Sequence, residues 1–412
     1  MDSSDFPGSS GNDEWTTDGL ECVKLKFVRS VDDIENAESY EPEYVYQHFG
    51  DTEKIFGYKN LSVTIVYSAA TLKVLPIIKY DSKIKESGIE ADDILAKLKE
   101  QLPGEQMSMQ VESVEEFRAA LMKEDNFKPI GEKISQFSVG EETFEMFRTD
   151  KPSPEFDEYL ARMQTLALWY INAAEYTDNE DEKWMHYTLF RSTRHTDGTP
   201  GSTYDFAGYA SLYRFYAYPE HQRPRLAQML LVPAYRRSGM GASFLQRIYS
   251  DLITFPKIKD ITVEDPADNM ILLRDYVDCV NCSTLPELAP EKLKLGFTTE
   301  MLTTLERKFK IGKRQARRIY EILRLRATSK KDKAEMAAYK QEVKRRLEAP
   351  MKRSDKEWKK MQAALDPEEI NQMTSVQMTD EAKAAQLEQL FEQEMEAYNR
   401  TIERISDHPN II

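Results

Sequence analysis

A turn with the pattern R-x-x-G-x-G at residues 236–241 constrains the fold of this chain more than any other feature. It follows an apolar segment at residues 228–232 that is typical of a buried strand, and it precedes apolar residues at helical spacing. Glycines at Gly239 and Gly241 let the backbone approach a ligand closely, and the N-terminus of a helix attracts negative charge. The sequence therefore predicts a strand, a turn and a helix that together bind a pyrophosphate group.

Two other phosphate-binding motifs do not fit this turn. A dinucleotide-binding fold has G-x-G-x-x-G in its first strand–helix turn, whereas this turn lies far along the chain and has a different glycine spacing. A P-loop ends in Gly-Lys-Ser or Gly-Lys-Thr, which is absent from the sequence. A strand–turn–helix whose glycines serve only the local geometry stays open as an alternative.

Two carboxylates stand at the end of the next apolar segment. Residues 261–263 (Ile-Thr-Val) favour a strand, and Glu264 and Asp265 follow it directly, before Pro266. A sheet presents catalytic groups at its strand ends, so this pair is a candidate for general acid–base chemistry. The alternative, equally consistent with the spacing, is that an acid here caps the helix that follows.

The composition excludes several classes of protein. The chain has 56 Lys and Arg against 71 Asp and Glu, a net charge of −15, which argues against a general nucleic-acid coat and favours a basic partner or substrate. No apolar run reaches the ~18 residues of a membrane span, and the polar, acidic first twenty residues do not resemble a secretory signal. Three cysteines cannot form a disulfide framework, and the single C-x-x-C pair, Cys279 and Cys282, does not predict a zinc site.

The spacing of apolar residues predicts four parts. Residues 1–20 are expected to be a disordered acidic arm, and residues 21–134 an N-terminal α+β domain in which Ser113 caps a helix. Residues 135–298 mix strands and helices, which predicts a central mixed sheet flanked by helices, and residues 299–412 favour helices alone. The expected fold class is therefore α/β (α+β).

Specific elements follow from the same spacing. In the central part we expect a helix from Ser153 to about residue 176 and another helix after Gly241. Strands are expected at residues 184–190, 206–218, 223–232 and 259–264, and further helices at 267–280, 302–326, 331–347, 354–365 and 380–405. The segment 306–326 is basic, and it stays open whether its charges form a solvated face, bind a partner or direct the protein to the nucleus.

The R-x-x-G-x-G turn and the downstream I-T-V-E-D-P at residues 261–266 together resemble the GNAT acetyltransferase superfamily, and within it the catalytic subunits of type B histone acetyltransferases. The likeness covers roughly residues 22–350. It extends to H-F-G-D at 48–51, F-G-Y-K at 56–59, Trp184, L-R-D at 273–275 and Q-A-R-R-x-Y-E-I-L-R-L at 315–325.

The resemblance implies a reaction and the residues that carry it. The chain would transfer acetyl from acetyl-CoA to lysines in the tail of free, newly synthesised histone H4, by direct attack of the amine on the thioester and without a metal. Glu264 would be the general base, with Asp265 beside it. The acetyl-CoA contacts would be Met229, Leu230, Leu231, Arg236, Arg237, Ser238, Gly239, Met240, Gly241 and Asn269. The histone-tail contacts would be Asp51, Thr52, Glu53, Trp184, Tyr213, Arg214 and Phe215.

This reaction needs a base. A free lysine has a pKa near 10.4, so presenting the neutral amine at pH 7 costs roughly 4.6 kcal/mol. In the family a second glutamate, on the long helix before the Trp motif, assists the base, and its matching position here is Asn172. Glu175 lies three residues further on, hence on nearly the same face of the expected helix, and is a candidate substitute.

The resemblance also implies partners and a location. A WD-repeat histone chaperone would be the associated subunit, with residues 193–205 and the C-terminal helices as candidate docking elements. The protein would act in chromatin assembly in the nucleus and cytoplasm, with no direct DNA binding and no membrane association. Two alternatives stay open: a GNAT acetyltransferase for another protein or a small amine, and a binding or scaffold protein whose CoA fold is vestigial. The acidic residues expected to contact the tail, such as Asp51 and Glu53, disfavour a small amine as the acceptor. The intact R-x-x-G-x-G turn and Glu264 disfavour a scaffold.

Overall fold

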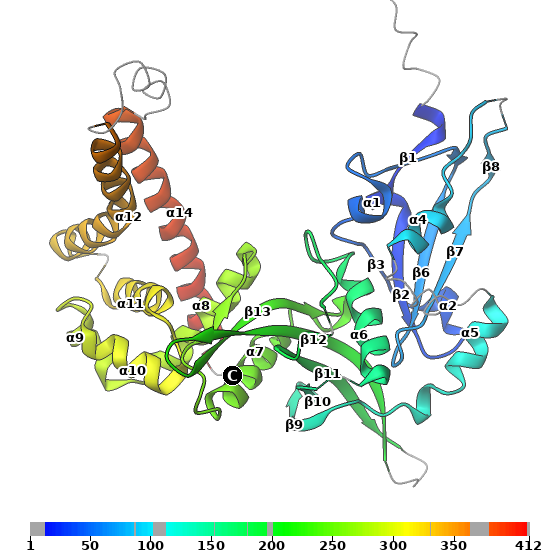
Figure 1. Ribbon diagram of the computed structural model, residues 1–412, viewed down its shortest axis with the longest axis horizontal. Coiled ribbons are helices and arrows are strands. Elements are labelled where there is room, and N and C mark those ends of the chain that lie inside the picture. Colours follow the sequence, from blue (N-terminus) through cyan, green and yellow to red (C-terminus); the bar gives the residue numbers. More distant parts are fainter. Residues whose placement is uncertain are drawn as a thin grey trace, which may run out of the picture. The chain divides into compact units, whose positions relative to one another are not determined.

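The computed structural model describes residues 13–85, 88–101, 113–151, 153–178, 180–195, 201–329, 331–362 and 379–409. The chain divides into two compact units, whose elements are labelled in Figure 1. Unit 1 is Met1–Ala217 with Arg223–Met240, and unit 2 is Tyr218–Gln222 with Gly241–Ile412. Helices and strands are mixed, which confirms the expected α/β class. The four-part division expected from the sequence stays a prediction.

Unit 1 contains a four-stranded sheet near the N-terminus, with strand order β3-β2-β6-β7. Its strands are β2 (Val23–Val28), β3 (Ser39–Tyr40), β6 (Ser62–Ser68) and β7 (Val74–Lys79), and β2 runs parallel to β6. Two helices follow in the chain, α4 (Ile94–Glu100) and α5 (Val114–Leu121). The hydroxyl of Ser113 accepts a hydrogen bond from the backbone N–H of Glu116 at 3.1 Å, which confirms the predicted cap of α5.

Part of the expected acidic arm, residues 13–20, forms regular secondary structure. Residues 1–12 lie outside the described part of the chain, but η1 (Asp13–Trp15), β1 (Thr16–Asp18) and the start of α1 (Gly19–Cys22) fall within residues 13–20. Strand β1 pairs with β4 (Lys54–Phe56), so the expectation of disorder is wrong for residues 13–20. The other short elements of this part are α2 (Asp33–Asn36), α3 (Tyr46–Phe49), β5 (Tyr58–Lys59), β8 (Ser82–Lys83) and η3 (Glu124–Asn126).

The main sheet of unit 1 has the strand order β13-β12-β11-β10-β9 (Figure 1). Its strands are β9 (Glu132–Val139), β10 (Glu142–Thr149), β11 (Trp184–Arg194), β12 (Ser202–Ala217) and β13 (His221–Leu231). Neighbouring strands from β9 to β12 pair antiparallel. The strands predicted at 184–190, 206–218 and 223–232 are thereby confirmed, although each begins or ends a few residues away from its predicted bounds.

Helix α6 (Pro154–Ala167) begins as predicted and ends early. The Ser153 hydroxyl accepts from the N–H of Phe156 at 3.2 Å, and Pro154 occupies the first turn. The predicted extension to about residue 176 is wrong, because Leu168 ends the helix and Ala173 has φ 51°. The apolar residues Leu168, Trp169 and Tyr170 follow the helix in a turn, and their side chains are buried there. The spacing of apolar residues therefore predicts too long a helix.

One hydrophobic core of unit 1 spans its four-stranded sheet and its main sheet. It joins buried side chains of β2 and β6 to those of α6 and of strands β10 to β13. Its largest buried members include Trp169, Tyr67 and Tyr159, and the indole N–H of Trp169 donates to the Tyr67 hydroxyl at 3.1 Å. The end of β13 belongs to the same core through Leu230 and Val232, so the strand that precedes the glycine turn is anchored on densely packed side chains.

Unit 2 is mostly helical. It contains α7 (Met240–Ile253, of which Met240 belongs to unit 1), β14 (Thr262–Val263), α8 (Asp268–Ser283), η5 (Pro286–Leu288), α9 (Pro290–Leu293), α10 (Thr299–Phe309), α11 (Lys313–Ala327), α12 (Lys333–Gln362) and α14 (Asp380–Asp407). Helices α12 and α14 lie side by side (Figure 1). The helices expected after Gly241, at 267–280 and at 380–405 are confirmed, with shifts of a few residues.

Three predicted elements of unit 2 differ from the structure. The helix expected at 302–326 is two helices, because Lys310 adopts a left-handed φ of 56° and Gly312 caps α11. The helices expected at 331–347 and 354–365 are one helix, α12, which contains Pro350; residues 363–365 lie outside the described part. The strand expected at 259–264 shrinks to the two residues of β14.

Of the helices in the described residues, none has a stretch both long and apolar enough to span a membrane.

Candidate functional site

The strand before the glycine turn passes very close to its neighbour. Met229, Leu230 and Leu231 are the last residues of β13, and Val232 donates its N–H to the carbonyl of Ala207 on β12 at 2.9 Å. A Cβ atom at Gly208 of β12 would lie 2.4 Å from the Leu230 carbonyl oxygen. Only glycine fits there, so the position of the Leu230 peptide depends on Gly208, a residue that belongs to none of the sequence motifs.

The glycine turn itself winds through two left-handed residues. After η4 (Pro233–Tyr235), Arg237 has φ 61° and Gly239 has φ 87°, and α7 begins at Met240. The Ser238 hydroxyl donates to the carbonyl of Tyr235 at 3.2 Å and closes the turn. A backbone that turns this way before a helix aims successive N–H groups toward one side, which suits an anion.

The Arg236 side chain is held within unit 1. Its Nη1 lies 2.5 Å from Oε1 of Glu43, its Nε donates to the Leu231 carbonyl at 2.9 Å, and its guanidinium stacks 4.4 Å from the ring of Tyr170. Burial raises the pKa of Tyr170, and the ring stays neutral beneath the cation. Arg236 therefore connects the end of β13 and the glycine turn to Glu43 and Tyr170. No signal in the sequence pointed to Glu43, because it lies 193 residues away.

The predicted base lies directly after β14. Glu264 and Asp265 are both exposed, and Asp265 has the unusual φ of 27°. Asn269, a predicted acetyl-CoA contact, is exposed in the first turn of α8. The N-cap residue of α8 is Ala267, so neither Glu264 nor Asp265 occupies the N-cap position of this helix.

The predicted residues are divided between the two units. Glu264, Asp265, Gly241 and Asn269 belong to unit 2. The remaining predicted acetyl-CoA contacts and all the predicted histone-tail contacts belong to unit 1.

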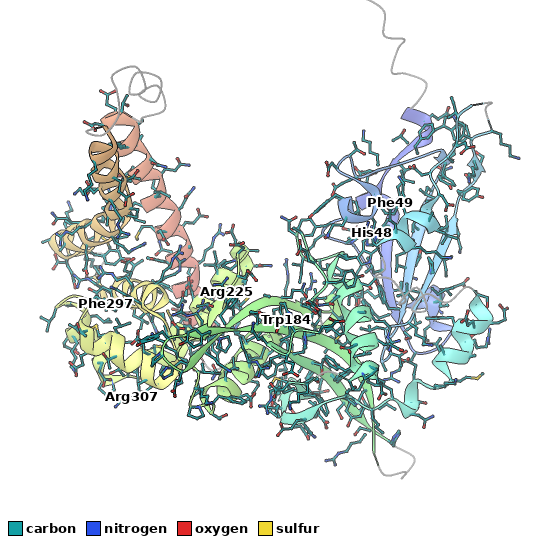
Figure 2. The ribbon with its side chains drawn as sticks, in the orientation of Figure 1. His48, Phe49, Trp184, Arg225, Phe297 and Arg307 are labelled. Carbon is teal, nitrogen blue, oxygen red and sulfur yellow. The ribbon has the colours of Figure 1, made fainter. Side chains whose placement is uncertain are left out.

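Part of the predicted tail surface is a row of aromatic rings on the main sheet. Trp184 at the start of β11 pairs in register with Tyr213 of β12, with ring centroids 5.1 Å apart. Tyr213 in turn packs 4.7 Å from Phe215, and the guanidinium of Arg225 lies 4.4 Å from the Phe215 ring. Figure 2 labels Trp184 and Arg225 on the main sheet. We call Trp184, Tyr213 and Phe215 the aromatic row; the structure brings these three predicted residues together, and Arg225 is an addition that the sequence did not reveal.

An acidic turn, which contains Asp181 and Glu182, borders the aromatic row. The hydroxyl of Tyr213 donates to Oδ2 of Asp181 at 2.7 Å, and this hydrogen bond lowers the pKa of the Asp181 carboxyl. Arg214, also predicted to contact the tail, instead turns its guanidinium to the backbone carbonyls of Glu182 and Lys183 and braces the turn. The row therefore presents rings beside a carboxylate that stays ionised.

The predicted acids at residues 51–53 form a separate turn. Gly50, with φ 83°, ends α3, and Asp51 and Thr52 after it are exposed. Glu53 has φ 55°, and its carbonyl accepts from the N–H of Gly19 at 2.7 Å, which fixes the turn before β4. The side chain of Asp51 is thus presented to solvent from a turn of defined shape.

The helper position near residue 172 is not helical. Because α6 ends at Ala167, Asn172 and Glu175 do not share a helix face, and the spacing argument that linked them is wrong. The Asn172 side chain accepts from the hydroxyl of Tyr46 at 2.8 Å, so it has a structural partner. Glu175 is exposed, and its backbone carbonyl accepts from the side-chain amide of Gln228 on β13 at 2.6 Å.

Two family models match parts of this chain. The model described as "Histone acetyl transferase HAT1 N-terminus" matches residues 15–172. The model described as "Histone acetyltransferase type B catalytic subunit, C-terminal" matches residues 274–325.

Full-length relatives carry the same description. The histone acetyltransferase type B catalytic subunit of Homo sapiens is 37% identical over 395 residues, covering 93% of this chain and 92% of the relative. That of Mus musculus is 36% identical, covering 93% of both chains. That of Cryptococcus neoformans var. neoformans serotype D (strain JEC21) is 29% identical over 377 residues, covering 81% of this chain and 89% of the relative.

One of the solved structures that match is an acetyltransferase that covers about a third of the chain. An aminoglycoside acetyltransferase from an uncultured soil metagenomic sample, in complex with sisomicin, covers 32% of this chain and 83% of its own at 12% identity, with a TM-score of 0.23. A TM-score of that size does not establish a shared fold.

Proposed function

We propose, because this chain belongs to the family of histone acetyltransferase type B catalytic subunits, that it acetylates lysines of the histone H4 amino-terminal tail with Glu264 as the general base. As a member of that family the chain is a histone acetyltransferase, with acetyl-CoA as the acetyl donor. The acceptor within the histone, the residues that bind and the order of proton transfers are the proposed parts.

Acetyl-CoA is proposed to bind through backbone groups of unit 1. The peptides of Met229, Leu230 and Leu231 would face the acetyl and pantetheine parts, and the turn from Arg236 to Met240, continued by Gly241, would surround the pyrophosphate. The close approach of Gly208 to Leu230 supports the first contact, and the left-handed residues Arg237 and Gly239 support the second. Arg236 contributes by holding the strand end and the turn, since its guanidinium is already engaged by Glu43 and the Leu231 carbonyl.

The acetyl transfer is proposed to begin with removal of a proton from the lysine ammonium. Glu264, exposed at the end of β14, takes that proton directly or through one water. The neutral amine then attacks the thioester carbonyl: the C–N bond forms and a tetrahedral oxyanion develops. The C–S bond then breaks, and the proton that the amine nitrogen still has to lose passes to the departing CoA thiolate, directly or through water, so that the products are the amide and the CoA thiol. Strand amides near Leu230 are suited to stabilise the oxyanion, because a backbone N–H placed in advance costs no reorganisation.

The H4 tail is proposed to bind at the aromatic row and the acidic turns. The observation that carries this proposal is the hydrogen bond that ties Asp181 to Tyr213, because it places an ionised carboxylate beside rings that can cover the aliphatic part of a lysine. Asp51, Thr52 and Glu53 would add contacts from their own turn. A tail rich in Lys and Arg matches a chain with a net charge of −15.

The wider setting is also a proposal. It comprises a WD-repeat histone chaperone as partner, a role in chromatin assembly, residence in the nucleus and cytoplasm, and no direct binding to DNA. These points rest on the resemblance, and the docking residues for the partner are not assigned.

A competition among acceptors tests the proposed substrate. The protein is incubated with acetyl-CoA and equal amounts of an H4 tail peptide, an H3 tail peptide and spermidine, and the products are quantified by mass spectrometry. The expected result is acetyl transfer mainly to lysines of the H4 peptide. Preferential acetylation of spermidine would favour the alternative of a small-amine acetyltransferase, and equal use of both peptides would remove the H4 preference.

A further inference from the structure

Two sequence motifs have no part in the proposed chemistry, yet the structure brings their polar side chains together in unit 2. The L-R-D motif lies on α8 and the Q-A-R-R motif on α11. The side-chain amide of Gln315 donates to Asp275 and to Asp278, both at 3.0 Å. We call the five residues Arg274, Asp275, Asp278, Gln315 and Arg318 the Arg274 cluster.

Ion pairs complete this cluster. Nε of Arg274 lies 3.5 Å from Oδ2 of Asp278, and Nε of Arg318 lies 2.6 Å from Oδ2 of Asp275. Arg318 also pairs with Glu394 of α14, which connects the cluster to the C-terminal helix. The side chains of Asp275 and Asp278 are 1% and 2% exposed, and this burial raises the pKa of Asp278 to about 6.

The Arg274 cluster holds the strand that leads to the proposed base. Nη2 of Arg274 donates to the backbone carbonyl of Ile261 at 2.8 Å. The backbone N–H of Ile261 donates to the carbonyl of Lys310, between α10 and α11, at 2.8 Å. Ile261 is 3% exposed, so its peptide groups depend on these two partners rather than on water.

Ile261 is placed to control Glu264. It immediately precedes β14, and Glu264 immediately follows β14. At about 3.3 Å per extended residue, the held peptide is only about 10 Å from the carboxylate-bearing residue. A tilt of the strand at Ile261 therefore moves the carboxylate, and a misplacement of about 1 Å can cost about a hundredfold in rate.

The chemistry of the cluster favours a positioning role over a purely stabilising one. Buried ion pairs add little net stability compared with well-packed apolar residues, because each charge loses its hydration. An arginine, however, offers several donors in a fixed plane, so Arg274 can hold the Ile261 carbonyl and Asp278 at the same time. A lysine at this place has only a single point charge on a flexible stem.

We propose that Arg274 is a positioning residue for the acetyl transfer: it fixes the Ile261 peptide and so aims Glu264, while Asp278 and Gln315 fix Arg274. The inference rests on the proposed function, because it assigns the base to Glu264. It assigns no contact with substrate or acetyl-CoA to Arg274.

Replacement of Arg274 by glutamine tests this role against a matched control. The control is Arg346→Gln, which breaks a pair with a carboxylate as buried as Asp278: Nε of Arg346 lies 2.9 and 3.1 Å from the carboxylate oxygens of Glu321. The Arg346 side chain is 33% exposed and that of Arg274 is 14% exposed. Both variants are expected to lower the melting temperature. Only Arg274→Gln is expected to lower kcat, by at least tenfold, with the KM for acetyl-CoA unchanged within twofold. Equal kcat values for the two variants would overturn the proposal.

A conservative variant covers the case in which Arg274→Gln does not fold. Arg274→Lys keeps the charge next to Asp278 but cannot hold two acceptors in one plane. Its kcat is expected to be intermediate between those of the native protein and the glutamine variant, or, if the latter is insoluble, at least threefold below native. A native kcat in a folded Arg274→Lys would contradict the proposal.

A double-mutant cycle separates this inference from the proposed function. If Arg274 acts only through Glu264, the double variant Glu264→Gln with Arg274→Gln is expected to be no slower than Glu264→Gln alone. Multiplying losses would show that Arg274 acts elsewhere, and would overturn the inference while leaving the base in place. A Glu264→Gln variant with native turnover would instead overturn the base itself.

Discussion

A methyl group at Gly208 is predicted to displace the strand that would bind acetyl-CoA. The Cβ of a Gly208→Ala variant would lie 2.4 Å from the Leu230 carbonyl oxygen and 2.7 Å from Cδ2 of Leu231, whereas ordinary contacts begin near 3.4 Å. The Leu231 side chain can rotate, but the Leu230 carbonyl belongs to the backbone. The end of β13 must therefore move by about 1 Å.

This displacement has a cost in binding and a cost in stability. A backbone hydrogen bond contributes about 1 kcal/mol, so misaligning one or two of them near Leu230 should raise the Kd for acetyl-CoA about tenfold. Overpacking a dense core costs about 1–3 kcal/mol, so the variant should unfold at a lower temperature but remain folded at 25 °C.

Calorimetric titration with acetyl-CoA is the assay, with Gly140→Asn as the control. Gly140 lies in the turn between β9 and β10 of the same sheet, nothing lies within 4 Å of the place that a Cβ atom would take there, and asparagine tolerates its φ of 60°. The control should bind acetyl-CoA as the native protein does. A folded Gly208→Ala with native affinity and native kcat would refute the reasoning that places acetyl-CoA on the Leu230 peptide.

Three further predictions concern the turn, the tail and pH. Glu43→Gln removes the ion pair behind Arg236, so the Kd for acetyl-CoA should rise two- to fivefold in calorimetry with little change in melting temperature; a native Kd would show that the brace is dispensable. Asp51→Asn with Glu53→Gln should raise the KM for an H4 tail peptide and leave kcat near native, and added salt should shrink the difference; a collapse of kcat at saturating peptide would place these acids in the chemistry. His48 is buried against Trp169, and burial lowers its pKa from 6.5 to about 3, so the folded state keeps the ring neutral while the unfolded state binds a proton below pH 6.5. The contribution of the neutral His48 ring to stability should be complete above pH 6.5 and fall by about 1.4 kcal/mol per pH unit as pH drops toward 3. Urea unfolding at pH 7 and pH 5 should therefore show a shallower decline for His48→Phe than for the native protein; an unchanged slope would contradict the assignment.

The local elements around the glycine turn were predictable from the sequence. The spacing of apolar residues predicts strand β13 and helix α7, and the glycines predict the turn between them. All of these features lie within a short stretch of the sequence. The cap of α5 by Ser113 is local in the same sense.

Long-range contacts were not predictable in this way. The brace between Glu43 and Arg236 joins residues 193 positions apart, and the hydrogen bond from Gln315 to Asp275 joins two motifs that lie 40 positions apart. The early end of α6 was missed for a related reason: the apolar residues after Ala167 are buried by tertiary packing, and periodicity does not distinguish a buried turn from a helix. The break at Lys310 was missed because lysine rarely adopts a left-handed φ.

The central claim is that Glu264 accepts the proton from the lysine. The most direct test is the single-turnover rate of acetyl transfer to an H4 tail peptide, measured at saturating acetyl-CoA for the native protein and for Glu264→Gln, which keeps the size of the side chain but cannot take up a proton. The rate in the variant is expected to be lower by about 10²–10⁴, with the Kd for acetyl-CoA unchanged. A near-native rate in that variant would contradict the claim and move the base to another carboxylate, with Asp265 and Glu175 the next to test.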